Sequence, residues 1–127
     1  MPPIRVLIVE DDDDIRETLI EVLEDNGFEA SSAANGAEAL ELLRAEGQHQ
    51  PNVILLDMMM PVLDGWGFRS AQLADPRLQA IPVIVLTAHA SIEETARTLG
   101  ATGFLRKPVR LDPLLDAIRR HAAATAS

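Results

Sequence analysis

The 127-residue chain contains no cysteine. This absence excludes a disulfide framework and any zinc site built on thiolates, and it suits a reducing compartment. The chain also lacks a long hydrophobic run. The apolar stretch at residues 4–9 is too short for a signal peptide or a membrane span, and acidic residues follow it directly. We therefore expect a cytoplasmic protein that makes no contact with a membrane.

Lysine is almost absent, because Lys107 is the only lysine among eleven basic residues. The net charge is −9, but it is unevenly distributed. Residues 1–64 hold fifteen acids and three bases, a balance of −12, whereas residues 65–127 hold five acids and eight bases, a balance of +3. The acidic half lacks the basic surface that nucleic-acid binding requires, so we expect no direct nucleic-acid contact. The basic excess suits either a partner surface or an ordinary solvated face.

Short apolar segments alternate with longer amphipathic ones along the chain, and 47% of the residues are hydrophobic, enough for one folded core. This alternation predicts a single-domain α/β fold, a doubly wound five-stranded parallel sheet with helices on both faces. In such sheets the functional site lies beyond the carboxyl ends of the strands. Strands are expected at residues 4–9, 29–34, 52–57, 81–88 and 102–108, and helices at 14–27, 36–47, 65–75, 91–100 and 110–124.

Polar side chains follow four of the five expected strands. Glu10 and Asp11 follow the first, Asp57 ends the third, Thr87 lies at the end of the fourth and Lys107 at the end of the fifth. Three carboxylates close together cannot all stay ionised without compensation. A hard divalent cation such as Mg²⁺, which prefers oxygen ligands, provides it. The sequence therefore predicts a magnesium site at this edge of the sheet.

The acidic run Glu10–Asp14 is expected to serve two purposes. Its first two residues belong to the metal site. Asp13 and Asp14 begin the first helix, where negative charge is favourable, and Glu17 follows Asp14 at the spacing of a capping box. Asp12 suits either task, and the sequence does not decide between them.

Four segments in order, VLIVEDD, VILLDMMMPVLDGWGF, PVIVLTA and GFLRKP, resemble the response-regulator receiver domain of two-component signalling (CheY-like). The resemblance covers about residues 4–121 and leaves 122–127 as a frayed tail. It implies a flavodoxin-like sheet with strand order 2-1-3-4-5. It also implies a signalling switch, not an enzyme in the usual sense, that accepts a phosphoryl group from a sensor histidine kinase or a phosphotransfer protein.

The resemblance further assigns roles at the phosphorylation site. Asp57 corresponds to the phosphoacceptor, Thr87 would hydrogen-bond the phosphoryl group, and Lys107 would pair with it. The peptide bond between Lys107 and Pro108 matches a cis peptide of the family. Magnesium and the two side chains would stabilise the charge of the transferred group by position and electrostatics.

The metal ligands and the switch also follow from the resemblance. Glu10 and Asp11 correspond to the acidic pair that holds Mg²⁺, with the backbone carbonyl of Met59 as a further ligand. Glu10 stands where aspartate is more usual, which adds a methylene to that ligand. Thr87 and Phe104 match the switch residues. Phe104 lacks the hydroxyl of a tyrosine, so the switch would act through packing alone.

Three other functions suit these residues less well. An aspartate-nucleophile phosphatase of the haloacid-dehalogenase type needs a second aspartate two residues after the nucleophile, where this chain has Met59. A flavodoxin that binds FMN needs a phosphate-binding loop after the first strand, and none is present. A degenerate receiver would not keep the acidic set together with Thr87 and Lys107.

The sequence says less about what the domain would contact after phosphorylation. Basic residues are frequent in residues 91–121, which we expect to contact a downstream protein target or a second copy of the chain. His49 and His121 are expected at the surface. The chain suits a stand-alone regulator or the receiver fragment of a larger DNA-binding regulator or hybrid kinase, and the sequence does not choose between them.

Overall fold

The computed structural model describes residues 3–46, 50–58, 65–87, 97 and 100–122. The helix expected at residues 91–100 lies mostly outside this part, so the labels pass from α3 to α5; Arg97 is helical and Gly100 lies in a turn. Among the helices of the described part, none is long and apolar enough to cross a membrane. The elements are β1 (Arg5–Val9), α1 (Asp13–Asp25), β2 (Glu29–Ala33), α2 (Gly36–Glu46), β3 (Val53–Asp57), α3 (Gly65–Ala74), β4 (Val83–Thr87), β5 (Gly103–Arg106) and α5 (Leu111–His121).

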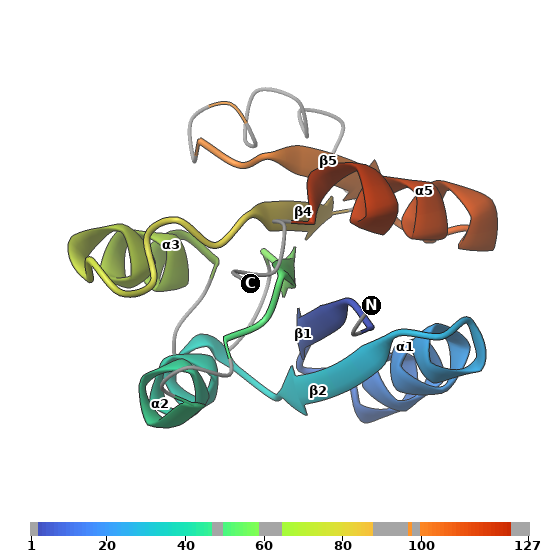
Figure 1. Ribbon diagram of the computed structural model, residues 1–127, viewed down its shortest axis with the longest axis horizontal. Coiled ribbons are helices and arrows are strands. Elements are labelled where there is room, and N and C mark those ends of the chain that lie inside the picture. The colour runs from blue at the N-terminus through green and yellow to red at the C-terminus, as the bar shows by residue number, and fades with distance from the viewer. Residues whose placement is uncertain (1–2, 47–49, 59–64, 88–96, 98–99, 123–127) are drawn as a thin grey trace.

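The five strands form one parallel sheet in the order β2-β1-β3-β4-β5, which confirms the expected topology (Figure 1). The register aligns the carboxyl ends of the strands. Asp57 at the end of β3 pairs with Leu86, and Thr87 at the end of β4 pairs with Arg106. The last residues of the central strands therefore lie at one edge of the sheet.

The core has two layers because alternate residues of a strand point to opposite faces of the sheet. In β1, Leu7 and Val9 pack on one side, and Val6 and Ile8 on the other. Helices α2 and α3 cover the first side, and α1 and α5 cover the second (Figure 1). All residues of β3 and β4 are buried, as expected for central strands covered on both faces.

Helix α1 begins one residue earlier than expected, at Asp13, with Asp12 as its N-cap. The Asp12 backbone is extended, and its Oδ1 accepts a hydrogen bond from the backbone N–H of Ile15 at 3.1 Å. This bond satisfies one of the free donors of the first turn. The capping box expected from Asp14 to Glu17 is therefore wrong, and Asp12 has the capping role that the sequence left open.

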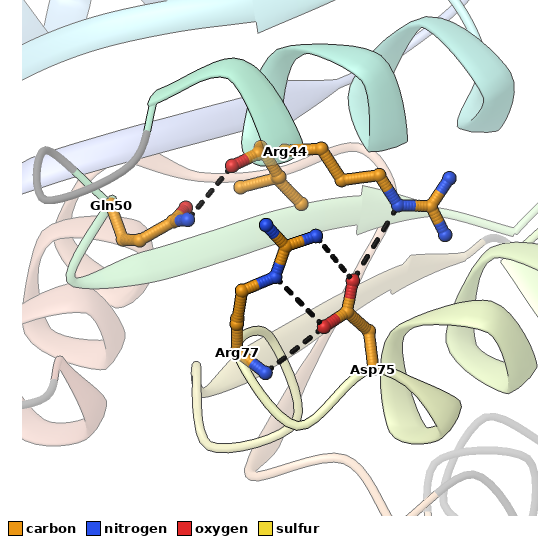
Figure 2. Close-up of polar contacts among 5 residues, drawn as sticks. Arg44, Gln50, Asp75 and Arg77 are labelled. Carbon is orange, nitrogen blue, oxygen red and sulfur yellow. Dashed lines mark hydrogen bonds and ion pairs between the residues drawn. The ribbon is translucent and has the colours of Figure 1, made fainter.

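A surface ion-pair group connects α2 to the segment after α3 (Figure 2). The carboxylate of Asp75 accepts hydrogen bonds from Arg77 at 3.2 and 3.3 Å and lies 3.5 Å from Arg44 Nε on α2. The hydrogen bonds from Arg77, and then its charge, lower the pKa of Asp75. Nearby, Gln50 Nε2 donates to the carbonyl oxygen of Leu43 at 2.8 Å. These contacts connect α2 to the segment before β3 and to the segment after α3.

A buried polar network on α3 was not expected from the sequence. Arg69 is 8% exposed and donates to Gln72 Oε1 at 2.8 Å and to the carbonyl oxygen of Gly100 at 3.0 Å. Gln72 is fully buried, and its Nε2 donates to the carbonyl oxygens of Leu78 and Ile81, both at 3.0 Å. Burial lowers the pKa of Arg69. The network joins α3 to the loop before β4 and to the turn before β5.

Candidate phosphoryl and metal site

The side chains predicted from the strand ends lie together at one edge of the sheet. Glu10 directly follows β1, Asp57 ends β3 and Thr87 ends β4; their exposed fractions are only 1%, 2% and 2%. Lys107 directly follows β5, and its backbone N–H donates to the carbonyl oxygen of Thr87 at 3.1 Å. Parallel pairing of β1, β3, β4 and β5 thus brings residues almost a hundred positions apart into one site.

The ammonium group of Lys107 lies between two buried carboxylates. Its Nζ is 3.1 Å from Asp57 Oδ1 and 3.2 Å from Glu10 Oε1. The side chain is about three-quarters buried, with 26% exposed. The peptide bond between Lys107 and Pro108 is cis, as expected. The single lysine of the chain is therefore part of the acidic site and not of the general surface.

Glu10, Asp11 and Asp57 each present a carboxylate oxygen, and these atoms lie within 4.8 Å of one another. All the donors are oxygens, which suits Mg²⁺ and not a soft metal. Three carboxylates against one ammonium leave an excess of two negative charges when all are ionised, which a divalent cation would balance. Asp11 is exposed, so the cluster opens to solvent. Met59, the further ligand expected from the resemblance, lies outside the described residues.

The site raises the pKa of both Glu10 and Lys107. Burial, and then the adjacent carboxylate of Asp57, raise the pKa of Glu10 from its usual 4.5 to about 7, although Lys107 works in the opposite direction. Burial alone would lower the pKa of Lys107, but the charges of Asp57 and Glu10 outweigh it and raise that pKa. Lys107 therefore stays protonated, while a proton and a metal ion compete for Glu10 near neutral pH.

Contacts from β2 and from the start of α1 also hold Glu10 in place. The backbone N–H of Glu10 donates to the carbonyl oxygen of Ala33 at 3.1 Å, and its Oε2 accepts from the N–H of Asp12 at 3.3 Å. Arg16 donates from Nη1 to the Glu10 carbonyl oxygen at 3.0 Å and pairs with Asp13. Sequence reasoning missed Arg16; the three-residue spacing of Asp13 and Arg16 on a helix was the available signal.

An apolar hollow of about 590 Å³ adjoins the carboxylates. Glu10 and Lys107 form part of its wall, so it opens onto the acidic site. Ile15 on α1 lines this hollow and is 41% exposed. Its other apolar lining residues are Leu19, Leu86, Pro108 and Val109.

Phe104 and His121 lie at β5 and the end of α5. Phe104 is 41% exposed on β5 and is paired in register with Val85, two residues before Thr87 on β4. His121, expected at the surface, is instead half-buried with its ring packed on Gly103. His49 lies outside the described residues.

A sheet of order 2-1-3-4-5 with an acidic cluster and a lysine at its carboxyl edge defines a CheY-like domain. The chain belongs to the response regulator receiver domain family, whose family model matches residues 6–119. It is 37% identical over 119 residues to the response regulator MprA of Mycobacterium sp. (strain KMS), covering 92% of this chain and 50% of that protein. It is 38% identical over 130 residues to the transcriptional regulatory protein PrrA of Mycobacterium tuberculosis (strain ATCC 25618 / H37Rv), covering 97% and 54%.

Solved structures agree with this assignment. The chemotaxis protein CheY4 of Vibrio cholerae superposes with a TM-score of 0.82 at 33% identity, covering 94% of this chain and 98% of that chain. The signal receiver domain of a signal transduction histidine kinase from Syntrophus aciditrophicus gives 0.80 at 32% identity, covering 91% and 87%. The chain spans about half the length of the curated relatives it matches. It is a receiver domain of two-component signalling, a class of phosphorylation switches.

Proposed function

We propose that Asp57 accepts a phosphoryl group from a sensor histidine kinase or a phosphotransfer protein, and that residues 4–121 act as the receiver unit. The position of Lys107 carries this proposal, with its Nζ 3.1 Å from Asp57 Oδ1 inside a buried acidic cluster. A lysine that only balanced surface charge would not need burial against two carboxylates. A cytoplasmic location, where such a kinase would act, is part of the proposal.

The proposed reaction is a transfer between two side chains. A carboxylate oxygen of Asp57 attacks phosphorus, the P–N bond to the donor histidine breaks, and a P–O bond forms to give an acyl phosphate. Charge on the transferred group is spread over its equatorial oxygens. The ammonium group of Lys107 and the hydroxyl group of Thr87 would bind two of these oxygens, one by charge and one by hydrogen bonding.

The residues present suit a magnesium ion as cofactor. Glu10, Asp11 and Asp57 would hold it, with the carbonyl oxygen of Met59 as a fourth protein ligand expected from the family resemblance. Bound Mg²⁺ would neutralise charge on the phosphoryl oxygens during transfer. Few of its ligands would be protein atoms, so binding would be weak.

The phosphodonor would approach through the apolar hollow beside the site. The hollow includes Glu10 and Lys107 in its wall and exposes Ile15. A helix of the donor that covers Ile15 would bury apolar surface and bring a phosphohistidine beside Asp57. The apolar lining of the hollow, together with the exposed side chain of Ile15, supports this docking role.

Phosphorylation of Asp57 would change the surface formed by residues 91–121. Thr87 would move toward the phosphoryl group, and Phe104 would turn into the space that it leaves, so that phosphorylation favours one of two packings. A downstream protein or a second copy of the chain would bind this face. The domain itself would make no direct contact with nucleic acid. Proteins similar to this chain include a transcriptional regulatory protein and the receiver domain of a signal transduction histidine kinase, so a larger regulator and a hybrid kinase both fit as its context.

The test is phosphorylation by acetyl phosphate and Mg²⁺, followed by intact-mass measurement. We expect one added phosphoryl group that is labile to base. Asp57→Asn should abolish it, because an amide is not a comparable nucleophile. Asp25→Asn, which changes an exposed aspartate at the end of α1, is the matched control and should be phosphorylated normally. A stable phosphate on Thr87 or on a histidine would contradict the proposal.

A further inference from the structure

A second hollow, here called the basic hollow, lies away from the carboxylate site. Its volume is about 520 Å³, within the range of small-molecule pockets. It lies at the first residue of β5 and the last of α5, two elements that run side by side, whereas the carboxylates follow the strand ends (Figure 1). Its lining includes Arg97, Thr102, Gly103, Phe104, Arg120 and His121.

The charge of the basic hollow suits an anion. Arg97 and Arg120 are among its lining residues, and none of the lining residues that the structure describes is acidic. Arg120 Nη2 bonds Asp116 Oδ2 at 3.0 Å, but both side chains are 68% exposed, and an exposed pair of this kind contributes little. An incoming phosphate can therefore compete for Arg120. Two arginines match phosphate oxygens better than lysines would, since guanidinium is a planar double donor.

One wall of the basic hollow is aromatic. Phe104 is 41% exposed, in a chain with only 3% aromatic residues. An exposed ring beside guanidinium groups offers a flat apolar surface for a planar group that carries negative charge. Aromatic side chains stack on any nucleobase, because every base has a π-face.

Gly103 and His121, two lining residues of the basic hollow, are in contact. A Cβ atom at Gly103 would lie 2.9 Å from both Cδ2 and Nε2 of His121, so the imidazole ring packs directly on the glycine backbone. The missing side chain at Gly103 makes room for the ring of His121. Thr102 adds a hydroxyl group at the rim. The hollow thus combines cations, a hydrogen-bonding ring and an aromatic face around one open volume.

We propose that the basic hollow binds a nucleotide, with its phosphates at Arg97 and Arg120 and its base against Phe104. An acidic protein segment would satisfy the two arginines, but it would leave the aromatic wall without a matching group. The site is separate from Asp57, and its occupation requires neither Mg²⁺ nor phosphorylation.

The experiment is a titration of the unphosphorylated chain in EDTA, followed by amide chemical shifts. ADP, adenosine and pyrophosphate are compared, since each of the last two offers only half of the proposed contacts. We expect ADP to shift Thr102, Gly103 and Phe104 and to bind about tenfold tighter than either fragment. EDTA removes metal ions, so the acidic site at Asp57 would repel the phosphates.

Variants test the geometry. Arg97→Gln and Arg120→Gln should each weaken ADP about fivefold or more, as loss of one charged contact predicts. Phe104→Leu should weaken ADP but leave pyrophosphate unchanged. Arg110→Gln is the matched control, because Arg110 is exposed near the start of α5 but does not line the basic hollow. All four changes are at exposed positions, and amide spectra would verify that each variant is folded.

Three results would overturn the proposal. Equal affinity for pyrophosphate and ADP, with equal weakening by Arg110→Gln, would mean a diffuse attraction to basic surface. Shifts confined to the loops around Asp57 would place the nucleotide elsewhere. Tighter binding of a tetraglutamate peptide than of ADP would assign this face to an acidic protein partner.

Discussion

Lys107 Nζ lies 3.2 Å from Glu10 Oε1, although 97 positions separate the two residues in the chain. Glu10 is almost completely buried, and the same ammonium group also contacts Asp57. One cation thus compensates two buried carboxylates in the metal-free protein. Its removal would take from both carboxylates the ammonium group that lies between them.

Lys107→Met should therefore destabilise the metal-free protein at pH 8, by about 2–3 kcal/mol in the free energy of unfolding. Denaturant titration in EDTA measures this loss. Added Mg²⁺ should recover part of it, because the ion replaces the lost positive charge. Arg120→Met removes an exposed ion pair and is the matched control, with an expected change below about 0.5 kcal/mol. Equal losses in the two variants would contradict the role given to Lys107.

The raised pKa of Glu10 predicts how stability depends on pH. The folded value of about 7 lies above the usual 4.5, so the folded state binds this proton more tightly than the unfolded state does. Its stabilising contribution is complete below about pH 4.5 and is lost as pH rises through about 7. In EDTA, Glu10→Gln should lack this loss between pH 5 and pH 8, and exposed Glu24→Gln should retain it. Identical pH profiles for the two variants would refute the assignment.

The same pKa predicts the pH dependence of metal binding. A proton on Glu10 competes with Mg²⁺, so the apparent affinity should fall as pH decreases below about 7. Titration at several pH values, followed by the fluorescence of Trp66, measures this dependence. Asp11→Ala should weaken Mg²⁺ binding at every pH, and Asp25→Ala should not. Wild-type affinity in the Asp11 variant would contradict the proposed metal site.

The start of α1 offers a direct test of the capping interaction. Asp12→Ala should lower the free energy of unfolding by about 1 kcal/mol, because it removes the hydrogen bond to the N–H of Ile15. Asp14→Ala should cost less, since Asp14 contributes only charge near the helix N-terminus. Thermal melts of both variants make the comparison. A larger loss at Asp14 would restore the capping box that the structure contradicts.

The network at Arg69 should couple to Gln72. Arg69→Ala removes the donors that bond the buried Oε1 of Gln72 and the carbonyl oxygen of Gly100. The free energy of unfolding should therefore fall by about 2–4 kcal/mol. A double-mutant cycle with Gln72→Leu should give a coupling of about 1–2 kcal/mol by denaturant titration. Arg77→Ala, which removes an exposed partner of Asp75 (Figure 2), should lower the free energy of unfolding far less. Additive effects of Arg69 and Gln72 would show that the network is not a unit.

The switch proposal predicts a change at β5 and α5. Beryllofluoride, which mimics a phosphoryl group on Asp57, should shift the amides of residues 103–106 and 111–121 as well as those of the site. Phe104→Ala should reduce the shifts in α5 while leaving those beside Asp57 intact, because the ring would no longer repack. Shifts confined to the surroundings of Asp57 would refute the switch.

Much of this site could be predicted from the sequence, because the end of a buried strand can be recognised from neighbouring residues alone. Buried strands show as apolar runs, and the polar residue after each run needs no tertiary information to be found. Parallel pairing then requires those residues to share one edge, so the meeting of Glu10, Asp57, Thr87 and Lys107 followed from the alternation of elements. The strand order came from the family motifs, since periodicity alone does not say which strands are neighbours.

Other features required the folded chain. Asp12 and Asp14 are equivalent in sequence, and only the extended backbone at Asp12 decides which carboxylate reaches the N–H of Ile15. The partners of Arg69 include a backbone carbonyl 31 residues away, which carries no signature in residue type. Hydrophobic patterning thus determined the elements and the edge of the sheet where these polar side chains meet. Hydrogen bonds to main-chain groups and the packing of His121 on Gly103 depend on distances that only tertiary structure sets.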